Sequence, residues 1–465
     1  MFYQSLILNI LITLIVLLKA IASDELHGLF GGVGGIVNDT FYVFGGMDIK
    51  NPTDEDVFNQ DNFNQGVYSL NLKDGVRLNE ALEANWKIDS LEHHPLDKML
   101  APSVIQINNN SAEFLIIGGA HQTLIERSVR IFDIKTNTWK IDKDGGKFIK
   151  GLNFPKSEGG TPNFGPLGAT LNQNDLNPDE LVLFGGEYLF ESLVEVNQTQ
   201  SYSGLIVYNS KENQWKTIGE ANGYYISGHN SIIHNGNLMI FGGKNIATNQ
   251  YLNFNKIISF NIKDKKWYFQ DTIGKIPERI FTFGLKKVGN YVYILGGATN
   301  DNVTNYADSS LHILDLNTFS WETKYISGFI STAFAILEYY NGHLLYTFGS
   351  HNNLLYSNTQ IINLKNYTLV NRIPSMEELE SLKPKSQLPA IIGGSIAGFI
   401  GLILLIILIY LGSKKIKREI IKRTPPPFVS EPTCDKSQFI VNDPNFSFDN
   451  DLEFDNTMSK SERQP

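Results

Sequence analysis

The feature that most constrains this chain is an apolar segment that ends in two glycines and recurs along most of its length. The full copies end at Gly45-Gly46, Gly118-Gly119, Gly185-Gly186, Gly242-Gly243 and Gly296-Gly297. A sixth copy ends in Phe348-Gly349-Ser350 and is interpreted as having lost its second glycine. Self-similarity of this kind predicts a repeat architecture in which one supersecondary unit is used several times.

A tryptophan follows four of the glycine pairs at a constant phase, seven residues after an apolar position of a second strand. The intervals are Phe132 to Trp139, Tyr208 to Trp215, Phe260 to Trp267 and Leu314 to Trp321. Paired glycines allow a tight turn where no Cβ fits, and tryptophan is large enough to fill the gap between neighbouring twisted sheets. Units one and six depart from the pattern, because Arg77 and Leu369 stand at the expected position. In unit one, Trp86 follows only after an insertion.

These residues resemble the kelch repeat, in which each copy forms one four-stranded blade of a β-propeller. The resemblance covers about residues 28–370 and implies an all-β fold, a six-bladed kelch-type β-propeller, with seven blades as the alternative. Small residues in the first strand of a unit, as in Gly31–Gly35, suit the innermost position around the axis. No spare strand precedes the first unit, so closure by face-to-face packing of the first and last blades is expected.

Two apolar runs lie outside the repeats. Residues 1–22 contain one such run followed by Ala20-Ile21-Ala22, which predicts a cleaved secretory signal peptide, with an uncleaved anchor as the alternative. Residues 388–411 carry no charge over a length that crosses a bilayer as a helix, so a transmembrane helix is predicted there. The lysines and arginines from Lys414 to Arg423 place the C-terminus in the cytoplasm.

Together these segments predict a single-pass type I membrane protein of the plasma membrane or the secretory pathway, with the propeller outside or in the lumen. The expected domains are a signal peptide (1–22), a propeller ectodomain (23–370), a juxtamembrane stalk (371–387), a transmembrane helix (388–411) and a disordered cytoplasmic tail (412–465). The single cysteine, Cys434, lies in the tail. The ectodomain must therefore be held by a large buried core rather than by disulfides.

Long loops are predicted to gather on one face of the propeller. They connect second to third strands, as in Met47–Gly66, Glu187–Ser203 and Ala298–Ser309, or the fourth strand to the next unit. Binding commonly resides on long loops held by a rigid scaffold, and kelch proteins generally recruit ligands through this face. The expected ligand-face residues are Asp54, Glu55, Asp56, Phe58, Phe63, Tyr188 and Phe190. Neutral insertions are the alternative explanation of the long loops.

Catalytic and metal-binding patterns are not found in the sequence, so no enzyme, cofactor or metal is predicted. The copper radical oxidases that resemble galactose oxidase need a Tyr–Cys cross-link, which an ectodomain without cysteine cannot form. His93-His94 lacks further spaced ligands. Asp54-x-Asp56 is followed by Phe58 where a calcium loop requires an oxygen ligand. Sialidase Asp-boxes, G-x-S-x-G and Walker sequences are also missing.

Two further patterns bear on the surface and on assembly. Sequons for N-glycosylation fall in the predicted ectodomain at Asn38, Asn109, Asn197, Asn302 and Asn366, in a number that an asparagine-rich chain reaches by chance. Ala390, Gly394 and Gly398 form a small-residue ridge in the predicted span, the basis for a hypothesis of helix-mediated homodimers. The net charge of -9 is mild, and the sequence shows no basic patch. No nucleic-acid partner is therefore expected.

The sequence therefore favours a non-catalytic surface protein whose propeller binds an unknown protein or glycan ligand in recognition, adhesion or polarity. It resembles membrane-anchored kelch proteins of fungi, some of which serve in cell polarity. One alternative is a lumenal scaffold or cargo-binding protein of the secretory pathway. The other is an enzyme with an unrecognised site on the loop face.

Overall fold

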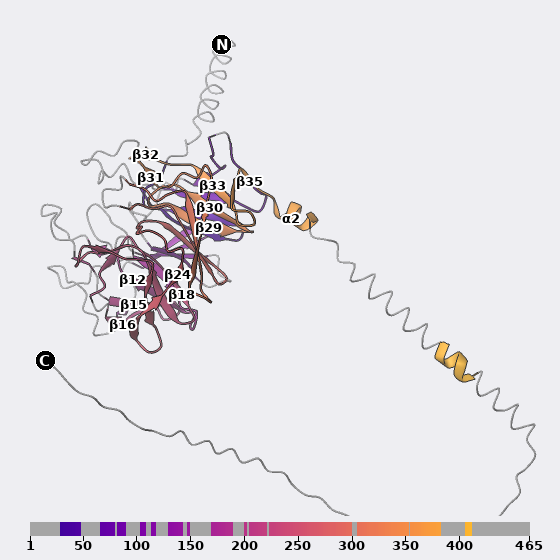
Figure 1. Ribbon diagram of the computed structural model, residues 1–465, viewed down its shortest axis with the longest axis horizontal. Coiled ribbons are helices and arrows are strands. Elements are labelled where there is room, and N and C mark those ends of the chain that lie inside the picture. Colours follow the sequence, from indigo (N-terminus) through magenta and orange to yellow (C-terminus); the bar gives the residue numbers. More distant parts are fainter. Residues whose placement is uncertain are drawn as a thin grey trace, which may run out of the picture. The chain divides into compact units, whose positions relative to one another are not determined.

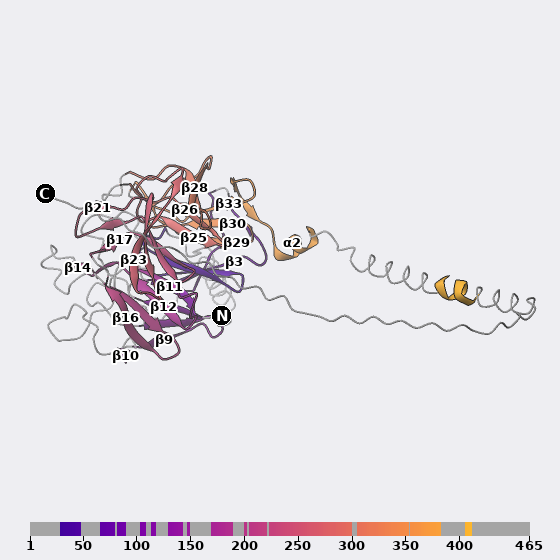
Figure 2. The ribbon, with the colours of Figure 1, turned by 60° about the horizontal axis from the view of Figure 1, so that its bottom comes forward.

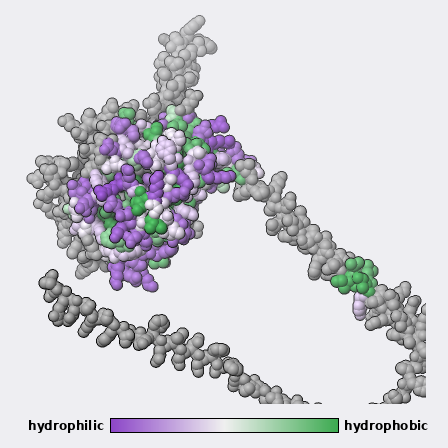
Figure 3. All heavy atoms as spheres, viewed as in Figure 1, coloured by the Kyte–Doolittle hydropathy of each residue, from purple (hydrophilic) through white to green (hydrophobic). Residues whose placement is uncertain are grey.

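The computed structural model describes residues 28–47, 66–79, 81–89, 103–107, 113–117, 129–142, 147–148, 169–188, 200–201, 204–220, 223–299, 305–352, 354–382 and 405–411. The chain divides into two compact units, Met1–Lys383 and Pro384–Pro465 (Figure 1). In the second unit, residues 405–411 are helical and exposed, and all but Tyr410 are strongly hydrophobic (Figure 3). None of the helices among the described residues is both long and apolar enough to span a bilayer. The predicted signal peptide, most of segment 388–411 and the tail lie outside the described residues.

The described residues of the first unit form six larger sheets, each with four antiparallel strands, which we number in chain order; sheets 3 and 5 gain a fifth, parallel strand. Sheet 1 holds β1 (Val33–Val37), β2 (Thr40–Phe44), β3 (Val67–Asn71) and β5 (Lys87–Asp89); sheet 2 holds β6 (Ser103–Ile107), β7 (Glu113–Ile117), β8 (Val129–Asp133) and β9 (Thr138–Asp142); sheet 3 holds β11 (Thr170–Gln173), β12 (Glu180–Phe184), β15 (Gly204–Asn209) and β16 (Gln214–Glu220). Sheet 4 holds β18 (Asn230–His234), β19 (Asn237–Phe241), β22 (Lys256–Asn261) and β23 (Lys266–Asp271); sheet 5 holds β25 (Gly284–Val288), β26 (Tyr291–Leu295), β27 (Ser310–Asp315) and β28 (Ser320–Tyr325); sheet 6 holds β29 (Ile336–Tyr340), β30 (His343–Thr347), β33 (Thr359–Asn363) and β34 (Thr368–Val370). The all-β, propeller-like fold predicted from the sequence is confirmed.

Shorter elements decorate these sheets. Two-residue strands β10 (Lys147–Phe148) and β24 (Ile273–Gly274) add in parallel to the outer strands of sheets 3 and 5. Other short strands are β4 (Val76–Arg77), β13 (Glu187–Tyr188), β14 (Gln200–Ser201), β17 (Ile226–Ser227), β20 (Lys244–Asn245), β21 (Gln250–Tyr251), β31 (Ser350–His351), β32 (Leu354–Leu355) and β35 (Arg372–Ile373). Helix α2 (Met376–Leu382) ends the unit.

The first strands of the sheets form a closed ring, because each of β1, β6, β11, β18, β25 and β29 contacts the next and β29 returns to β1. They line a central cavity of about 620 Å³. In Figure 2 the first strands β11 and β25 are labelled nearer the middle of the unit than the fourth strands β9, β16 and β28. The sheets are thus arranged around one axis.

The glycine pairs join neighbouring sheets. At the described pairs the first glycine has φ of 56–71° and the second 82–97°, both in the left-handed region that favours glycine. The second glycine donates its backbone N–H to a carbonyl in the segment that leads into the first strand of the next sheet. The bonds run from Gly186 to Ile226, Gly243 to Ile280, Gly297 to Thr332 and Gly349 to Leu29. The last of these closes the ring from sheet 6 to sheet 1 with the bond that joins the other sheets.

This comparison corrects the interpretation of the sixth copy of the glycine repeat, which lies in sheet 6. Gly349, with φ of 90° and the inter-sheet bond, occupies the position of a second glycine. Phe348, with φ of 63°, occupies the position of a first glycine. The copy has therefore lost its first glycine, not its second as expected. Phe348 accepts the strained backbone while its ring is buried against Tyr68 and Trp86 of sheet 1.

Each tryptophan packs against the sheet that precedes its own. Trp139 meets Phe44 at 5.9 Å between ring centroids, Trp267 meets Phe184 at 5.7 Å, and Trp321 meets Phe241 at 6.5 Å. Trp215 joins a buried cluster with Leu115 and Ile117 of sheet 2. The indole rings thus fill the wedge between adjacent sheets, as the sequence pattern indicates.

The insertion in unit one leaves this packing intact. Lys87 pairs with Ser69, so the register places Trp86 opposite Leu70, just as Trp267 lies opposite Phe260 in sheet 4. Trp86 is 8% exposed and packs on Phe348 of sheet 6. In sheet 6 the same register position holds Leu369, opposite Ile362.

The segment after sheet 6 docks onto that insertion. Strand β35 pairs with β4, Leu78 donates its N–H to Asn371, and the N–H of Met376 reaches the carbonyl of Lys73. Ile373 is fully buried. Residues 371–382, expected to begin a stalk, are thus part of the first unit. We call this segment with β4 the C-terminal clasp.

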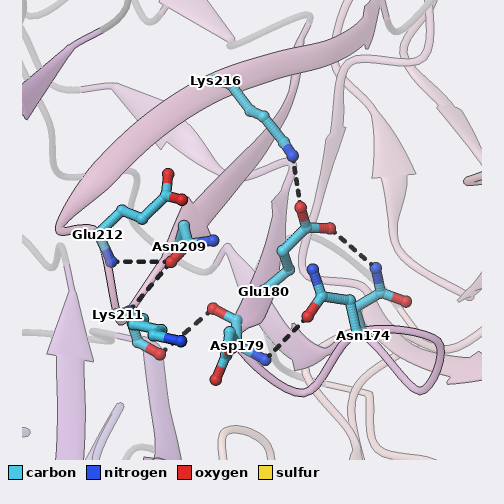
Figure 4. A network of polar contacts seen from close by, with 9 residues as sticks. Asn174, Asp179, Glu180, Asn209, Lys211, Glu212 and Lys216 are labelled. Atoms are coloured by element: carbon cyan, nitrogen blue, oxygen red, sulfur yellow. Dashed lines mark hydrogen bonds and ion pairs between the residues drawn. The ribbon is translucent and has the colours of Figure 1, made fainter.

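The turns from third to fourth strands share one design. An Asp or Asn side chain six residues before the tryptophan position accepts backbone N–H bonds, and the residue two before it has a positive φ; the pairs are Asp133 with Asn137, Asn209 with Asn213, Asn261 with Lys265, Asp315 with Phe319 and Asn363 with Tyr367. Figure 4 shows this turn in sheet 3, where Asn209 accepts from the N–H groups of Lys211 and Glu212. Beside it Glu180 bonds Lys216 and Asn174, tying the turn between first and second strands to the outer strand.

Candidate ligand-binding face

The antiparallel order of the sheets gives the unit two unlike faces. Short turns between first and second and between third and fourth strands share the turn face. Connections between second and third strands, and from each sheet to the next, share the opposite face, which we call the long-loop face. Among the described residues this face carries the small strand pairs β13–β14, β20–β21 and β31–β32.

The predicted ligand-face residues fall largely outside the described part of the chain. Asp54, Glu55, Asp56, Phe58, Phe63 and Phe190 are not described. Tyr188 lies in β13, where its backbone pairs with Gln200 of β14 on the long-loop face. Their proximity to one another stays a prediction.

Two of the predicted sequons are described, and both lie on the turn face. Asn38 is exposed in the turn between β1 and β2, and Asn366 is exposed in the turn between β33 and β34. The hydroxyl of Thr368 donates to the side-chain oxygen of Asn366 at 2.9 Å. The sequons at Asn109, Asn197 and Asn302 lie outside the described residues.

A cleft of about 700 Å³ opens on the long-loop face between sheets 5 and 6. Three segments line it: residues 305–309 from the loop before β27, residues 329–331 from the connection between the sheets, and His351 with Asn352 after β31. We call it the 5/6 cleft. The first segment belongs to the loop Ala298–Ser309, which the sequence marks as long.

An aromatic pair is fixed at the wall of the 5/6 cleft. The rings of Tyr306 and His351 stack with centroids 4.1 Å apart and planes 29° apart. The Tyr306 hydroxyl accepts the N–H of Asn352 at 2.8 Å, and burial raises the pKa of Tyr306. His351 Nδ1 lies 2.7 Å from the carbonyl oxygen of Ser331. Because a carbonyl only accepts, Nδ1 carries the proton, and in the neutral ring Nε2 is left as an acceptor.

Asp308 and Ser331 add two more polar groups to the lining. The carboxylate of Asp308 is exposed, and its Oδ2 accepts a 2.8 Å bond from Ser310 Oγ, which holds its orientation. Ser331 is 6% exposed, and its Oγ has no hydrogen-bond partner among the described residues. A buried hydroxyl without a partner is uncommon, because leaving a buried polar group unsatisfied costs about 1–3 kcal/mol.

The central cavity has a different character, since its polar side chains bond to one another. Thr170 Oγ1 lies 2.5 Å from Ser231 Oγ, which also accepts from Asn172 at 2.6 Å. Lys286 pairs with Glu338 at 2.5 Å. The neighbouring Lys287 donates to the carbonyl of Ile233, and burial lowers its pKa against the opposing effect of Asp175. These groups consume one another's hydrogen-bonding capacity.

The buried histidine His229, beside the central cavity, carries no charge. His229 Nε2 lies 3.0 Å from Thr170 Oγ1, and burial lowers its pKa to about 4, so the ring is neutral at physiological pH. Within the residues the structure describes, no group of three or more His, Cys, Asp or Glu is placed to hold a metal ion.

Comparison with protein families gives a match over the second half of the first unit. The model of the KLHDC2/KLHL20/DRC7 Kelch-repeats domain matches residues 170–385. These residues carry kelch repeats. The matched kelch region begins at β11 and runs through sheets 3 to 6 to β35 and α2. The kelch family predicted from the sequence is thereby supported.

The kelch relatives share a shorter stretch. Kelch domain-containing protein 10 of Rattus norvegicus is 33% identical over 90 residues, which is 19% of this chain and 21% of the relative. The Homo sapiens protein of that name is 33% identical over 90 residues, 19% of each chain, and that of Xenopus tropicalis 32% over 90 residues, 19% and 21%. This chain therefore spans about a fifth of the length of these relatives. A solved structure described as "Structure of YjhT" superposes with a TM-score of 0.49 at 14% identity, covering 74% of this chain and 97% of the other.

The sequence missed the residues of the 5/6 cleft although it marked one of its loops. Tyr306 and Asp308 lie in the loop Ala298–Ser309, but nothing in their spacing distinguishes them from neighbours. Ser331 and His351 come from two other connections, and only the closing of sheet 6 onto sheet 5 brings them together. A tyrosine in a long loop was the one usable signal.

Proposed function

We propose that this chain is a non-catalytic, single-pass type I membrane protein whose propeller binds a protein or glycan ligand through its long-loop face. The observation that carries this proposal is the contrast between the two faces. The turn face is closed by short turns whose side chains bond their own backbone, whereas the long-loop face holds a cleft with an unsatisfied buried hydroxyl. Kelch repeats are typical of protein-binding propellers, which supports the same interpretation.

A six-bladed ring is part of this proposal. The described residues supply six four-stranded sheets, and their first strands contact one another in a closed circle. Closure proceeds face to face, with the C-terminal clasp added at the seam rather than a strand exchanged into sheet 1. These features favour six blades over seven.

The absence of catalysis is proposed from chemistry. A copper radical cofactor needs a cysteine beside its tyrosine, and Cys434 is the only cysteine of the chain. The hydroxyl, imidazole and carboxylate of the 5/6 cleft are not arranged as a nucleophile with its base, because Ser331 Oγ makes no hydrogen bond to the imidazole among the described residues. A binding role uses every group of the cleft without that requirement.

The proposal is tested with the full chain displayed on cells and carrying a C-terminal tag. Protease protection of the tag in sealed vesicles should place it in the cytoplasm, and surface labelling separates the plasma membrane from internal membranes, which the lumenal-scaffold alternative requires. Binding is then measured on arrays of glycans and of purified surface proteins.

The decisive variant removes residues 51–64, which the sequence places between β2 and β3. We expect loss of binding with an unchanged thermal unfolding midpoint. The matched control replaces Asn235→Asp in a two-residue turn of the turn face, where the positive φ is tolerated by both residues. Binding that survives the deletion would refute the proposal, and binding that also disappears in the control would assign the ligand to the turn face.

A further inference from the structure

We infer that the 5/6 cleft receives a basic side chain, arginine or lysine, presented by the ligand. This inference deepens the proposed function and rests on it, because it names the chemical group that the long-loop face recognises. It is carried by the kinds of polar atom that line the cleft and by the charge they leave uncompensated.

The cleft is rich in acceptors. Asp308 presents a carboxylate held by Ser310, and His351 presents Nε2 because its Nδ1–H is committed to the Ser331 carbonyl. Ser331 Oγ is buried and has no partner among the described residues, so it needs one from outside. A ligand that brings several N–H donors satisfies all of these groups, whereas a ligand made of acceptors could pair with the Ser331 hydroxyl alone and would leave Asp308 and His351 Nε2 without a donor.

Charge points the same way. Within the described lining of the 5/6 cleft, Asp308 is exposed and no lysine or arginine accompanies it. An anionic ligand would meet a like charge, and a neutral one would leave the carboxylate uncompensated. An ammonium or guanidinium forms a charge-assisted bond with it, which is about twice as strong as a neutral one.

The aromatic wall fits a cation as well. Tyr306 and His351 stack on each other, and both border the cleft. A cation near the edge or face of a tyrosine ring gains additional attraction, and the planar guanidinium also stacks on aromatic rings. The molecule already contains such a contact on the same face, where Lys244 Nζ lies 5.5 Å from the Tyr251 ring centroid.

The central cavity is the weaker candidate for this role. Lys286 and Glu338 compensate each other, and the hydroxyl and amide groups form bonds among themselves. An entering cation would have to displace Lys286 from Glu338. The 5/6 cleft needs no such displacement.

The experiment measures peptide binding to the detergent-purified full chain by titration calorimetry. The probes are blocked tripeptides Gly-Arg-Gly and Gly-Lys-Gly, each against a neutral isostere with citrulline or acetyl-lysine in the middle position. We expect at least one charged peptide to bind about tenfold more tightly than its neutral partner, and to weaken as salt is raised. Free putrescine distinguishes a side chain on a peptide from a small amine.

Two variants assign the binding to the cleft. Asp308→Asn keeps the shape and should remove the preference for the charged peptide, while Asp264→Asn, at an exposed turn of the opposite face, should leave it unchanged. Ser331→Ala should weaken binding about threefold without lowering the unfolding midpoint, since its hydroxyl makes no bond to lose.

Equal binding of charged and neutral peptides, tighter binding of putrescine than of either peptide, or an unchanged preference in Asp308→Asn would overturn the inference. If the Asp308→Asn chain still captures its cellular ligand, the proposed function stands and the cation site alone is lost. If the deletion of residues 51–64 also leaves capture intact, the proposed function fails separately.

Discussion

Neighbouring sheets of the ring meet at interfaces that we call seams. Two of these seams share the same glycine hydrogen bond but differ in how many further contacts hold them. At the seam between sheets 5 and 6, Gly297 donates its N–H to Thr332. At the closing seam between sheets 6 and 1, Gly349 donates to Leu29 in the same manner. The closing seam then adds bonds from sheet 6 to the insertion of sheet 1, among them Thr359 N–H to Leu82, Trp86 Nε1 to Thr359 Oγ1 and Asn358 to Ala81.

The difference follows from chain connectivity. Sheets 5 and 6 are joined by a short connection, so little chain entropy is lost when they pack together. The closing seam joins residues about 270 positions apart, such as Trp86 and Thr359, and the entropy lost on closing a loop grows with its length. The insertion and the C-terminal clasp supply the extra contacts at the seam that the chain does not hold together by itself.

The largest effect is expected at the closing seam, from Trp86→Ala. The indole is buried between Phe41 and Phe348, and truncating a buried tryptophan costs about 3–5 kcal/mol of unfolding free energy. Chemical denaturation of the full chain measures it. The matched variant at the other seam, Leu369→Ala, should cost about 2 kcal/mol, because the smaller side chain is only partly buried. Equal losses would contradict the claim that the closing seam depends more on its wedge residue.

The next effect belongs to the seam between sheets 5 and 6, from Gly296→Ala. Gly296 has φ of 69°, and a Cβ there would overlap the hydroxyl of Tyr346 from the next sheet. Backbone strain and the clash together should cost about 3 kcal/mol. The control is Gly289→Ala, which has φ of 58° but open space around it and should cost only about 1 kcal/mol. A similar loss in both variants would show that the close approach to sheet 6 is unimportant.

A third variant, Tyr346→Phe, removes the group that fills the space left by Gly296. The hydroxyl accepts from Thr332 N and Oγ1 and donates to the Thr332 carbonyl, so its loss should cost about 1–3 kcal/mol at neutral pH.

The same variant carries a pH signature. Burial raises the pKa of Tyr346 from 10.0 to about 12. The folded state therefore binds this proton more tightly than the unfolded chain, and its stabilising effect is complete below pH 10 and lost as pH rises toward 12. Denaturation curves between pH 9 and 12 should fall less steeply for Tyr346→Phe than for the parent chain. Parallel curves would contradict this assignment.

The smallest effect is expected from Tyr340→Phe at the closing seam. Its hydroxyl donates to Asp39 Oδ1 at 3.0 Å across the seam, a single bond near the turn face. We expect a loss of about 1 kcal/mol in the same denaturation assay. A loss larger than that of Tyr346→Phe would show that this one contact dominates the closing seam.

Much of the fold could be predicted because the same local sequence pattern recurs in several units. Glycine pairs and tryptophans mark strand ends and wedges, and these positions depend on neighbours within one unit or the next. The sequence could not show that Phe348 replaces the first glycine of its pair, because a phenylalanine in a left-handed conformation gives no sequence signal. Only its φ and the bond made by Gly349 reveal which glycine was replaced.

The candidate site was less predictable than the fold, and the reason is geometric. Tyr306, Ser331 and His351 lie on three separate connections with no periodic relation in sequence. The C-terminal clasp escaped for a similar reason, since pairing of Arg372–Ile373 with Val76–Arg77 joins segments from opposite ends of the propeller. Contacts of that separation are set by ring closure rather than by local pattern.

The two ends of the propeller segment are attached on opposite faces of the ring, and this affects how the closing seam would respond to force. Leu29 is bonded on the long-loop face, whereas α2 is held on the turn face by Lys73 and Asn341. If force were applied between a ligand on the long-loop face and the C-terminal end of α2, the β4–β35 pair would lie in its path before the strands of sheet 6. Because β4 and β35 are only two residues long, we expect them to separate under force before the six larger sheets do.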